Sequence, residues 1–178
     1  MSGWKPGDRR ADRDSMIRVD QAGEYGATRI YAGQLAVLRN TAPETRLIAR
    51  MAAQEERHLK RFDRMMAERR VRPTMLRPVW DVAGFALGAV TALMSEKAAL
   101  ACTDAVETEI DRHYGEQLDE LGDEDPELAA TIAEFRAEEV EHRDIAREAG
   151  AAEAVGYPLL TATIRAGCRA AIALSKRI

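Results

Sequence analysis

Apolar residues recur every three or four positions along most of this chain, a spacing that predicts α-helices rather than strands. The first such stretch starts at residue 14 or 15 and runs to about 39, and the second covers about 44–70. A turn at 40–43 is expected to join them, and Pro73 and Pro78 are expected to break the chain after the second helix. The pattern therefore predicts a helical hairpin.

The same pattern returns in the second half of the chain. A helix is expected over 100–121, an acidic turn over 122–126, and a further helix over 128–146. With the first pair, these helices predict an all-α fold in which four helices pack as a bundle. At 178 residues the chain is long enough for one domain with a sizeable core and too short for two domains of ordinary size.

Two apolar segments lie outside these four amphipathic helices. The 14 residues 82–95 carry no charge but are too few for a membrane span, which needs about 20 apolar residues. They form either a buried core helix or a segment in a membrane interface. The tail 159–178 predicts an amphipathic helix with Arg165 and Arg169 on its basic side, which either caps the bundle or lies on an anionic lipid surface. Together the two segments favour additional apolar helices for membrane association.

Composition and charge limit the remaining possibilities. Residues 1–14 have neither apolar periodicity nor the apolar run of a secretory signal, so we expect a mobile tail followed by a single helical-bundle domain at 15–178. The net charge of −4 comes from 26 basic and 30 acidic residues that are interleaved, which argues against nucleic acid as a partner. Cys102 and Cys168 belong to no Cys-x-x-Cys pair, so a disulfide framework or a thiolate zinc site is not expected, and a reducing cytoplasmic setting fits.

The candidate chemistry lies in a Glu-x-x-His motif that occurs twice. Glu55 stands three residues before His58, and Glu139 stands three residues before His142, 84 residues later. On a helix this spacing places both side chains on one face, one turn apart, where they can hold one metal ion. The chain has three histidines, and the motif uses two of them.

The residues around the motif repeat as well. A lone Glu stands 31 or 32 residues before the Glu of each motif, an Asp stands about one turn before that lone Glu, and a Tyr stands seven residues after it. These residues are Asp20, Glu24 and Tyr31 in the first copy, and Asp104, Glu107 and Tyr114 in the second. The shared register indicates a duplicated helical hairpin.

The apolar stripes indicate which glutamates face the bundle interior. Glu55 lies in the apolar stripe of its helix, whereas Glu56 lies on the solvated side. Glu139 likewise lies in its stripe, and Glu138 lies off the centre of that stripe. Glu109 falls on the opposite face of its helix, together with other acidic residues.

Four inward carboxylates and two imidazoles match the ligand set of ferritin-like di-iron proteins. The candidate ligands are Glu24, Glu55, His58, Glu107, Glu139 and His142. Hard oxygen ligands with one imidazole for each metal favour iron or manganese over zinc. Two ions about 3.5–4 Å apart would be bridged by Glu55 and Glu139, with Glu24 and Glu107 as terminal ligands.

A second layer of residues is expected around these ligands. Asp20 and Asp104 are candidates to orient the two imidazoles, and solvation on the helix surface is the alternative explanation for both. Tyr31 and Tyr114 keep the same register in the two copies and are assigned to the same layer.

Five segments spread over nearly the whole chain carry a family resemblance. They read IRVDQAGEYGATRIYAGQ at 17–34, EERHL at 55–59, ACTDAVE at 101–107, EEVEH at 138–142 and AGCR at 166–169. In these segments the chain resembles the demethoxyubiquinone hydroxylase family of ubiquinone biosynthesis. Every position at which that family carries an iron ligand is filled by the matching residue, and these positions are the six candidate ligands.

The resemblance implies a di-iron monooxygenase that hydroxylates the ring of demethoxyubiquinone or demethoxyubiquinol, the penultimate step of ubiquinone (coenzyme Q) biosynthesis. It implies two iron ions as cofactor, O2 as co-substrate, and NADH or the reduced quinol as the source of two electrons. The prenylated substrate would enter through an apolar mouth formed by 82–95 and 159–175. His113, Tyr114 and Tyr157 resemble family positions discussed for electron or substrate handling, and ordinary packing or surface solvation is the alternative for each.

Location and partners follow from the same resemblance. The protein is expected on the membrane surface, at the cytoplasmic face of a bacterial inner membrane or at the mitochondrial inner membrane. The lack of an Arg- and Ser-rich leader favours the bacterial setting. Expected partners are the membrane, a lipid-binding accessory protein of ubiquinone biosynthesis and a second copy of the chain, with no nucleic acid.

Two other functions would use parts of the same pattern. Another ferritin-like di-metal protein, such as a ferroxidase, an iron-storage protein or a manganese catalase, would share the ligands and have no need of the apolar segments. A helical interaction protein at a membrane surface would carry the same Glu and His residues as surface charges and would bind no metal.

Overall fold

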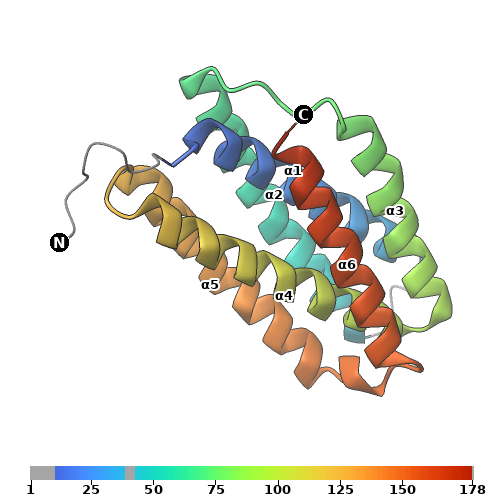
Figure 1. Ribbon diagram of the computed structural model, residues 1–178. Helices are drawn as coiled ribbons and strands as arrows, with labels where there is room; N and C mark the ends of the chain where they lie inside the picture. The colour runs from blue at the N-terminus through green and yellow to red at the C-terminus, as the bar shows by residue number, and fades with distance from the viewer. Residues whose placement is uncertain (1–10, 39–42, 178) are drawn as a thin grey trace.

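The computed structural model describes residues 11–38 and 43–177, and within them the chain forms helices and no strand. The helices are α1 (Arg13–Val37), α2 (Pro43–Arg69), α3 (Arg77–Met94), α4 (Glu96–Leu121), α5 (Pro126–Glu148), the short 3-10 helix η1 (Ala151–Glu153) and α6 (Tyr157–Ser175). The expected all-α, ferritin-like bundle is confirmed (Figure 1).

The helix boundaries agree with the sequence pattern to within a few residues. α1 begins at Arg13, so the end of the expected tail 1–14 is helical, while residues 1–10 lie outside the described residues. The expected turn at 40–43 falls mostly on residues 39–42, which also lie outside them.

Capping side chains explain where the later helices begin. Ser95 has an extended backbone that ends α3, and its hydroxyl accepts a hydrogen bond from the Ala98 N–H at the start of α4 (3.0 Å). Asp125 caps α5 in the same way through the Leu128 N–H (3.1 Å). Gly122, with φ of 50°, ends α4 in a backbone conformation that favours glycine. These signals separate α4 from its neighbours and turn it back into α5.

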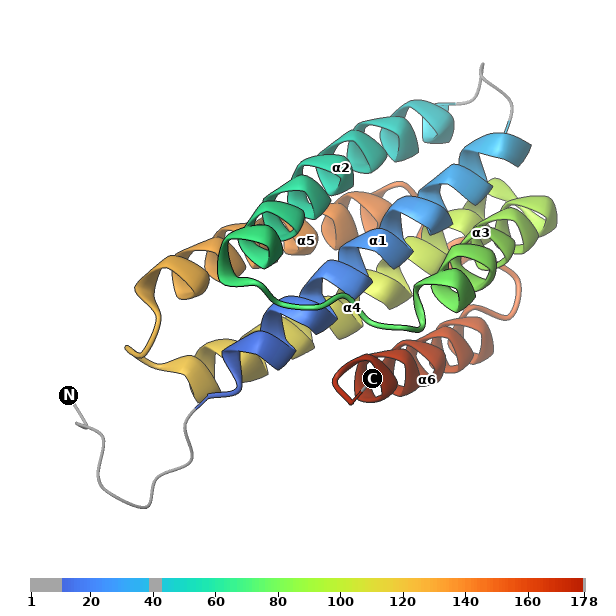
Figure 2. The ribbon, with the colours of Figure 1, turned by 90° about the horizontal axis from the view of Figure 1, so that it is seen from above.

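α1, α2, α4 and α5 form the bundle, and α3 and α6 lie on the same side of it, away from α2 (Figure 2). α3 runs parallel to α1, because Gly84 lies against Gly26 and Gly88 lies against Ile30. α6 runs parallel to α4 in the same manner. The repeat therefore covers three helices in each half of the chain, with α3 corresponding to α6.

Two apolar clusters occupy the two ends of the bundle. One contains Ile17, Phe62, Leu128, Ile132 and Phe135 among its members. The other contains Leu38, Ile48, Met51, Leu100 and Ala146 among its members. Each cluster takes one end of each bundle helix, so the middle of these helices lies between two apolar layers, shielded from water.

α3 exposes apolar side chains and is therefore not a buried core helix. Its buried residues are small or polar, namely Gly84, Gly88, Thr91 and Ala92. Val82 and Leu93 are 68% and 72% exposed, and Leu159 on α6 is 76% exposed. Among the described residues, no helix has the length and apolar character needed to cross a membrane. α3 and α6 thus present an apolar surface outside the bundle.

Candidate metal centre

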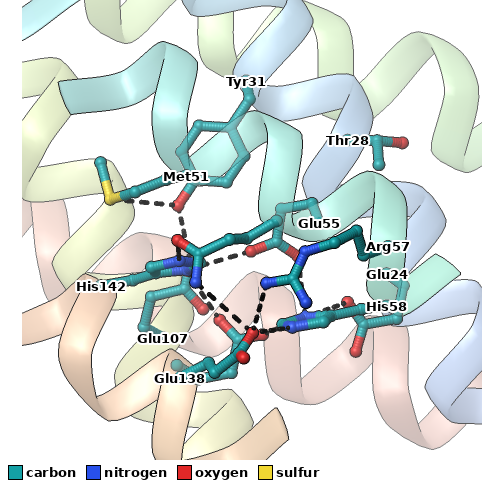
Figure 3. A network of polar contacts seen from close by, with 12 residues as sticks. Glu24, Thr28, Tyr31, Met51, Glu55, Arg57, His58, Glu107, Glu138 and His142 are labelled. Carbon is teal, nitrogen blue, oxygen red and sulfur yellow. Dashed lines mark hydrogen bonds and ion pairs between the residues drawn. The ribbon is translucent and has the colours of Figure 1, made fainter. Parts of the chain in front are cut away.

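The six candidate ligands converge between the two apolar clusters. Figure 3 labels five of them, namely Glu24, Glu55, His58, Glu107 and His142. α1 contributes Glu24, α2 contributes Glu55 and His58, α4 contributes Glu107, and α5 contributes Glu139 and His142. Each is at most 1% exposed, so the hypothesis that they are surface charges of an interaction protein is wrong.

These six residues form two overlapping groups that could each hold a metal ion. One group is Glu24, Glu55, His58 and Glu139, and the other is Glu55, Glu107, Glu139 and His142. Within each group the ligand atoms lie within 4.8 Å of one another. Glu55 and Glu139 belong to both groups, which is the arrangement that bridging carboxylates require.

Each histidine turns its Nδ1 nitrogen toward the carboxylates of the candidate ligands. His58 Nδ1 lies 2.9 Å from Glu139 Oε1 and 3.5 Å from Glu24 Oε2. His142 Nδ1 lies 3.1 Å from Glu55 Oε1 and 3.2 Å from Glu139 Oε2. Each imidazole therefore contributes one nitrogen to one group.

The buried polar atoms of this layer fit a pair of metal ions. Several of them meet no hydrogen-bond partner of acceptable geometry among the residues that the structure describes. They are Glu24 Oε2, Glu55 Oε1 and Oε2, His58 Nδ1, Glu107 Oε2, Glu139 Oε1 and Oε2, and His142 Nδ1. Unsatisfied buried carboxylates are costly, and cations with oxygen and imidazole ligands would satisfy them.

The electrostatics of the layer without metal support the same conclusion. Burial, followed by the neighbouring carboxylates, raises the pKa of Glu55 and Glu107 well above the usual range, and burial also raises the pKa of Glu139. Burial acts to lower the pKa of His58, but its contacts with Glu139 and Glu24 outweigh burial and raise that pKa to about 11. Burial lowers the pKa of His142. Crowded carboxyl groups of this kind retain protons unless cations replace them.

Two buried tyrosines contact the terminal carboxylates, each from the other half of the repeat. The Tyr31 hydroxyl on α1 donates a hydrogen bond to Glu107 Oε1 on α4 (2.9 Å). The Tyr114 hydroxyl on α4 donates to Glu24 Oε1 on α1. Both tyrosines thus lie directly behind candidate ligands, where their shared register had assigned them.

The partners behind the histidines are not the expected aspartates. His58 Nε2 lies 2.6 Å from Glu138 Oε2, and His142 Nε2 lies 3.0 Å from Gln54 Oε1. Both partners stand on α2 and α5, the helices that carry the histidines, whereas Asp20 stands on α1 and Asp104 on α4. The residues that contact Nε2, Gln54 and Glu138, each stand directly before a Glu-x-x-His motif in the sequence, and this shared position could have identified them.

Asp20 and Asp104 instead organise the neighbouring helices. Asp20 Oδ1 lies 3.2 Å from His113 Nε2 and accepts a hydrogen bond from Gln117 Nε2 (2.9 Å). Asp104 accepts from Arg147 on α5 (2.7 Å) and from the Tyr157 hydroxyl at the start of α6. His113 and Tyr157 therefore pair with these aspartates rather than with the six candidate ligands.

Glu109 is a buried residue whose environment the sequence pattern did not reveal. Its face of α4, opposite the metal-facing stripe, is covered by α6, and its side chain is fully buried. Its carboxylate accepts hydrogen bonds from Arg112 (3.0 Å), Arg165 (2.7 Å) and Arg169 (2.7 Å). The four-residue spacing of two arginines in an otherwise apolar helix was the signal for a buried anion.

An apolar cavity of about 380 Å³ lies between α1, α3, α4 and α6. Its lining includes Ile30, Trp80, Leu87, Ile110, Ile164 and Cys168. Gly23 and Val106 also line it, and each precedes a terminal candidate ligand in the sequence. The cavity therefore lies against the segments of α1 and α4 that carry Glu24 and Glu107, on the side of the bundle covered by α3 and α6.

A bundle whose inner faces present a Glu and a Glu-x-x-His motif twice defines the class of ferritin-like di-metal carboxylate proteins. Within that class, comparison with known families gives a match to the ubiquinone biosynthesis protein COQ7 family over residues 11–175. The chain belongs to this family, which confirms the resemblance read from the sequence.

Individual relatives are similar over nearly the whole chain. The 3-demethoxyubiquinol 3-hydroxylase of Rhodospirillum rubrum is 55% identical over 165 residues, covering 93% of this chain and 78% of the relative. The human mitochondrial NADPH-dependent 3-demethoxyubiquinone 3-hydroxylase is 52% identical over 173 residues, covering 95% and 79%. The mitochondrial 5-demethoxyubiquinone hydroxylase of Saccharomyces cerevisiae is 42% identical over 181 residues, covering 93% and 78%.

Proposed function

We propose that the protein is an O2-dependent di-iron monooxygenase that hydroxylates the ring of demethoxyubiquinone or demethoxyubiquinol, the penultimate step of ubiquinone biosynthesis. The observation that carries this proposal is the buried Glu/His layer beside an apolar cavity. The names of the relatives from R. rubrum, human and S. cerevisiae support the same step.

The six ligands divide into three roles. Glu55 and Glu139 would bridge two iron ions, Glu24 and Glu107 would bind one ion each, and His58 and His142 would each supply Nδ1. When bound, the iron pair supplies the site at which O2 is bound and reduced. Tyr31 and Tyr114 hold the terminal carboxylates in place, and the apolar clusters keep water out of the layer.

The reaction inserts one oxygen atom of O2 into a ring C–H bond and releases the other as water, with two electrons and two protons. The cavity between α3 and α6 suits the apolar end of a prenylated substrate, because its lining is mostly small and aliphatic side chains, with the aromatic ring of Trp80. The exposed apolar residues of α3 and α6 would rest on the membrane that holds this substrate.

The electron donor and the location belong to the same proposal. The human relative is named NADPH-dependent, and a reduced nicotinamide or the quinol itself would supply the two electrons here. The eukaryotic relatives are named mitochondrial, whereas the name of the R. rubrum relative states no location, so the proposal keeps both the mitochondrial and the bacterial inner membrane. A lipid-binding accessory protein and a second copy of the chain stay as expected partners.

The decisive experiment is hydroxylation by the iron-loaded protein with ¹⁸O2 and a prenylated demethoxyquinol. We expect one ¹⁸O atom in the product, and we expect Glu139→Ala to abolish both iron binding and product formation. Glu56→Ala is the matched control, because Glu56 is exposed on the same face of α2 as Lys60 and contacts no ligand. If Glu139→Ala kept its iron and its activity, the ligand assignment would be wrong.

The ferroxidase or manganese catalase alternative shares the ligand set. The apolar cavity favours the hydroxylase, since neither Fe²⁺ oxidation nor peroxide disproportionation uses an apolar substrate. Rapid oxidation of many Fe²⁺ ions per protein without quinol hydroxylation, or peroxide turnover by the manganese-loaded protein, would support the alternative.

A further inference from the structure

The two halves of the repeat differ at the residue that stands directly before each Glu-x-x-His motif. The first copy has Gln54 there, and the second has Glu138. In the folded chain each of these side chains lies behind the histidine of the other copy. His58 Nε2 is 2.6 Å from a carboxylate oxygen, and His142 Nε2 is 3.0 Å from an amide oxygen (Figure 3).

Both contacts leave Nδ1 free for a metal, because a carboxylate or an amide oxygen accepts the proton of Nε2. They differ in strength. A hydrogen bond to a carboxylate is charge-assisted and shorter than one to an amide, and it makes the imidazole a more basic ligand. The observed distances follow this order, so His58 is the stronger donor of the two.

Neighbouring side chains hold the carboxylate in this position. Arg57 lies 3.1 Å from Glu138 Oε2, and Gln54 Nε2 lies 3.4 Å from the same oxygen. The Arg57 side chain is 56% exposed, so water screens its charge and the carboxylate keeps most of its effect on His58. Apart from these outer partners, the two candidate metal positions have the same kinds of ligand. Each has one terminal Glu that accepts a hydrogen bond from a tyrosine, and both share the same two carboxylates.

We propose that this Glu/Gln difference makes the two metal positions unequal, so that the ion held by His58 binds more tightly than the ion held by His142. The inference rests on the proposed di-metal site and assigns Glu138 and Gln54 as positioning residues that act through the histidines. Outer partners of this kind commonly change metal affinity by about 10–100-fold, and a difference at the lower end of this range is expected.

The test is an anaerobic titration of the metal-free protein with Fe²⁺, followed by calorimetry, together with Mössbauer spectra of the ⁵⁷Fe-loaded protein. We expect two unequal binding steps and two distinct iron signals. His142→Ala keeps the tight step, and His58→Ala keeps the weak step. Equal steps in the unaltered protein would overturn the proposal, and so would a chain that binds no iron.

Exchange of the two side chains separates this inference from a general loss of stability. Glu138→Gln brings the two steps together, and the double variant Gln54→Glu with Glu138→Gln reverses which histidine variant keeps the tight step. Glu134→Gln is the matched control, since Glu134 is exposed one turn earlier on α5. If the double variant kept the original order of affinities, another feature of the site would set the difference.

Hydroxylation is measured separately on the same preparations. Two unequal iron sites without quinol hydroxylation would overturn the proposed function and leave this inference standing. Hydroxylation by a protein with two equal iron sites would overturn this inference and leave the proposed function standing.

Discussion

The Tyr31 hydroxyl on α1 donates a hydrogen bond of 2.9 Å to Glu107 on α4, across the boundary between the two halves of the repeat. Tyr114 makes the reciprocal bond to Glu24. Each terminal carboxylate is therefore oriented by the half of the chain to which it does not belong. The layer of candidate metal ligands is therefore formed by both hairpins together, and neither hairpin could form it alone.

Replacement of Tyr31 by Phe should lower metal affinity by about 10–100-fold, because the change leaves Glu107 without its donor while it keeps the ring. Tyr25→Phe is the control: its hydroxyl bonds to Asp81 (3.0 Å) and joins α1 to α3 away from the ligands. Fe²⁺ titration of both variants checks the prediction. Equal affinities in the two variants would contradict it.

Gly88 of α3 lies so close to α1 that a Cβ atom there would sit 1.9 Å from the Ile30 carbonyl oxygen. Gly88→Ala should therefore push α3 away from the bundle and lower the free energy of unfolding by about 1–3 kcal/mol, although Ala is the better helix former. Gly167→Ala on α6 meets no atom within 4 Å and should raise stability by up to about 1 kcal/mol. Urea unfolding measures both changes, and a neutral Gly88→Ala variant would mean that the contact is looser than described.

The helices and the six candidate ligands could be predicted from the sequence because both depend on local spacing. A three-residue step from Glu55 to His58 fixes a shared helix face wherever the helix lies, and the duplicated register then indicates which distant residues meet. The tyrosines at 31 and 114 followed from the same register.

Contacts between side chains of different helices could not be predicted from local spacing. Glu138 lay off the centre of its stripe, yet it meets His58 because α2 and α5 pack side by side. Glu109 faced away from the metal layer, and only the position of α6 makes that face buried. Asp104 accepts hydrogen bonds from side chains of α5 and α6 rather than from an imidazole. Its helix, α4, lies on the other side of the histidine rings from their Nε2 partners.

Glu109→Gln should loosen α6, because the arginines at 165 and 169 lose the buried charge that they share. We expect a loss of about 1–3 kcal/mol in unfolding free energy, below the value for a fully buried pair because the arginines are almost half exposed. Since α6 lines the cavity, the KM for a prenylated demethoxyquinol should rise several-fold, while that for a quinol without a tail should not. Glu116→Gln, which also removes a partner of Arg112 but is exposed, is the control. A KM that rises equally for both quinols would place the effect at the ring rather than at the tail.

Asp125 takes part in two stabilising contacts, and substitutions measured at different pH values can separate them. Its carboxylate pairs with Arg69 at the end of α2 and caps α5 through the Leu128 N–H. Asp125→Ala removes both contacts and should cost about 1–3 kcal/mol, whereas Asp125→Asn keeps the cap and should cost less. Denaturant unfolding near neutral pH measures this difference.

The bond from Arg69, followed by the Leu128 N–H, holds the pKa of Asp125 below its ordinary value of 3.8 against the opposing effect of burial. A carboxyl whose pKa is lower in the folded state contributes stability above its unfolded pKa and loses it as the pH falls through the folded value. The stability gap between the unaltered protein and Asp125→Asn should therefore be constant above about pH 5 and shrink below about pH 4. Because both proteins protonate their other carboxyl groups alike, the gap isolates this one residue, and a gap that widened in acid would show that the charge of Asp125 does not stabilise the joint between α2 and α5.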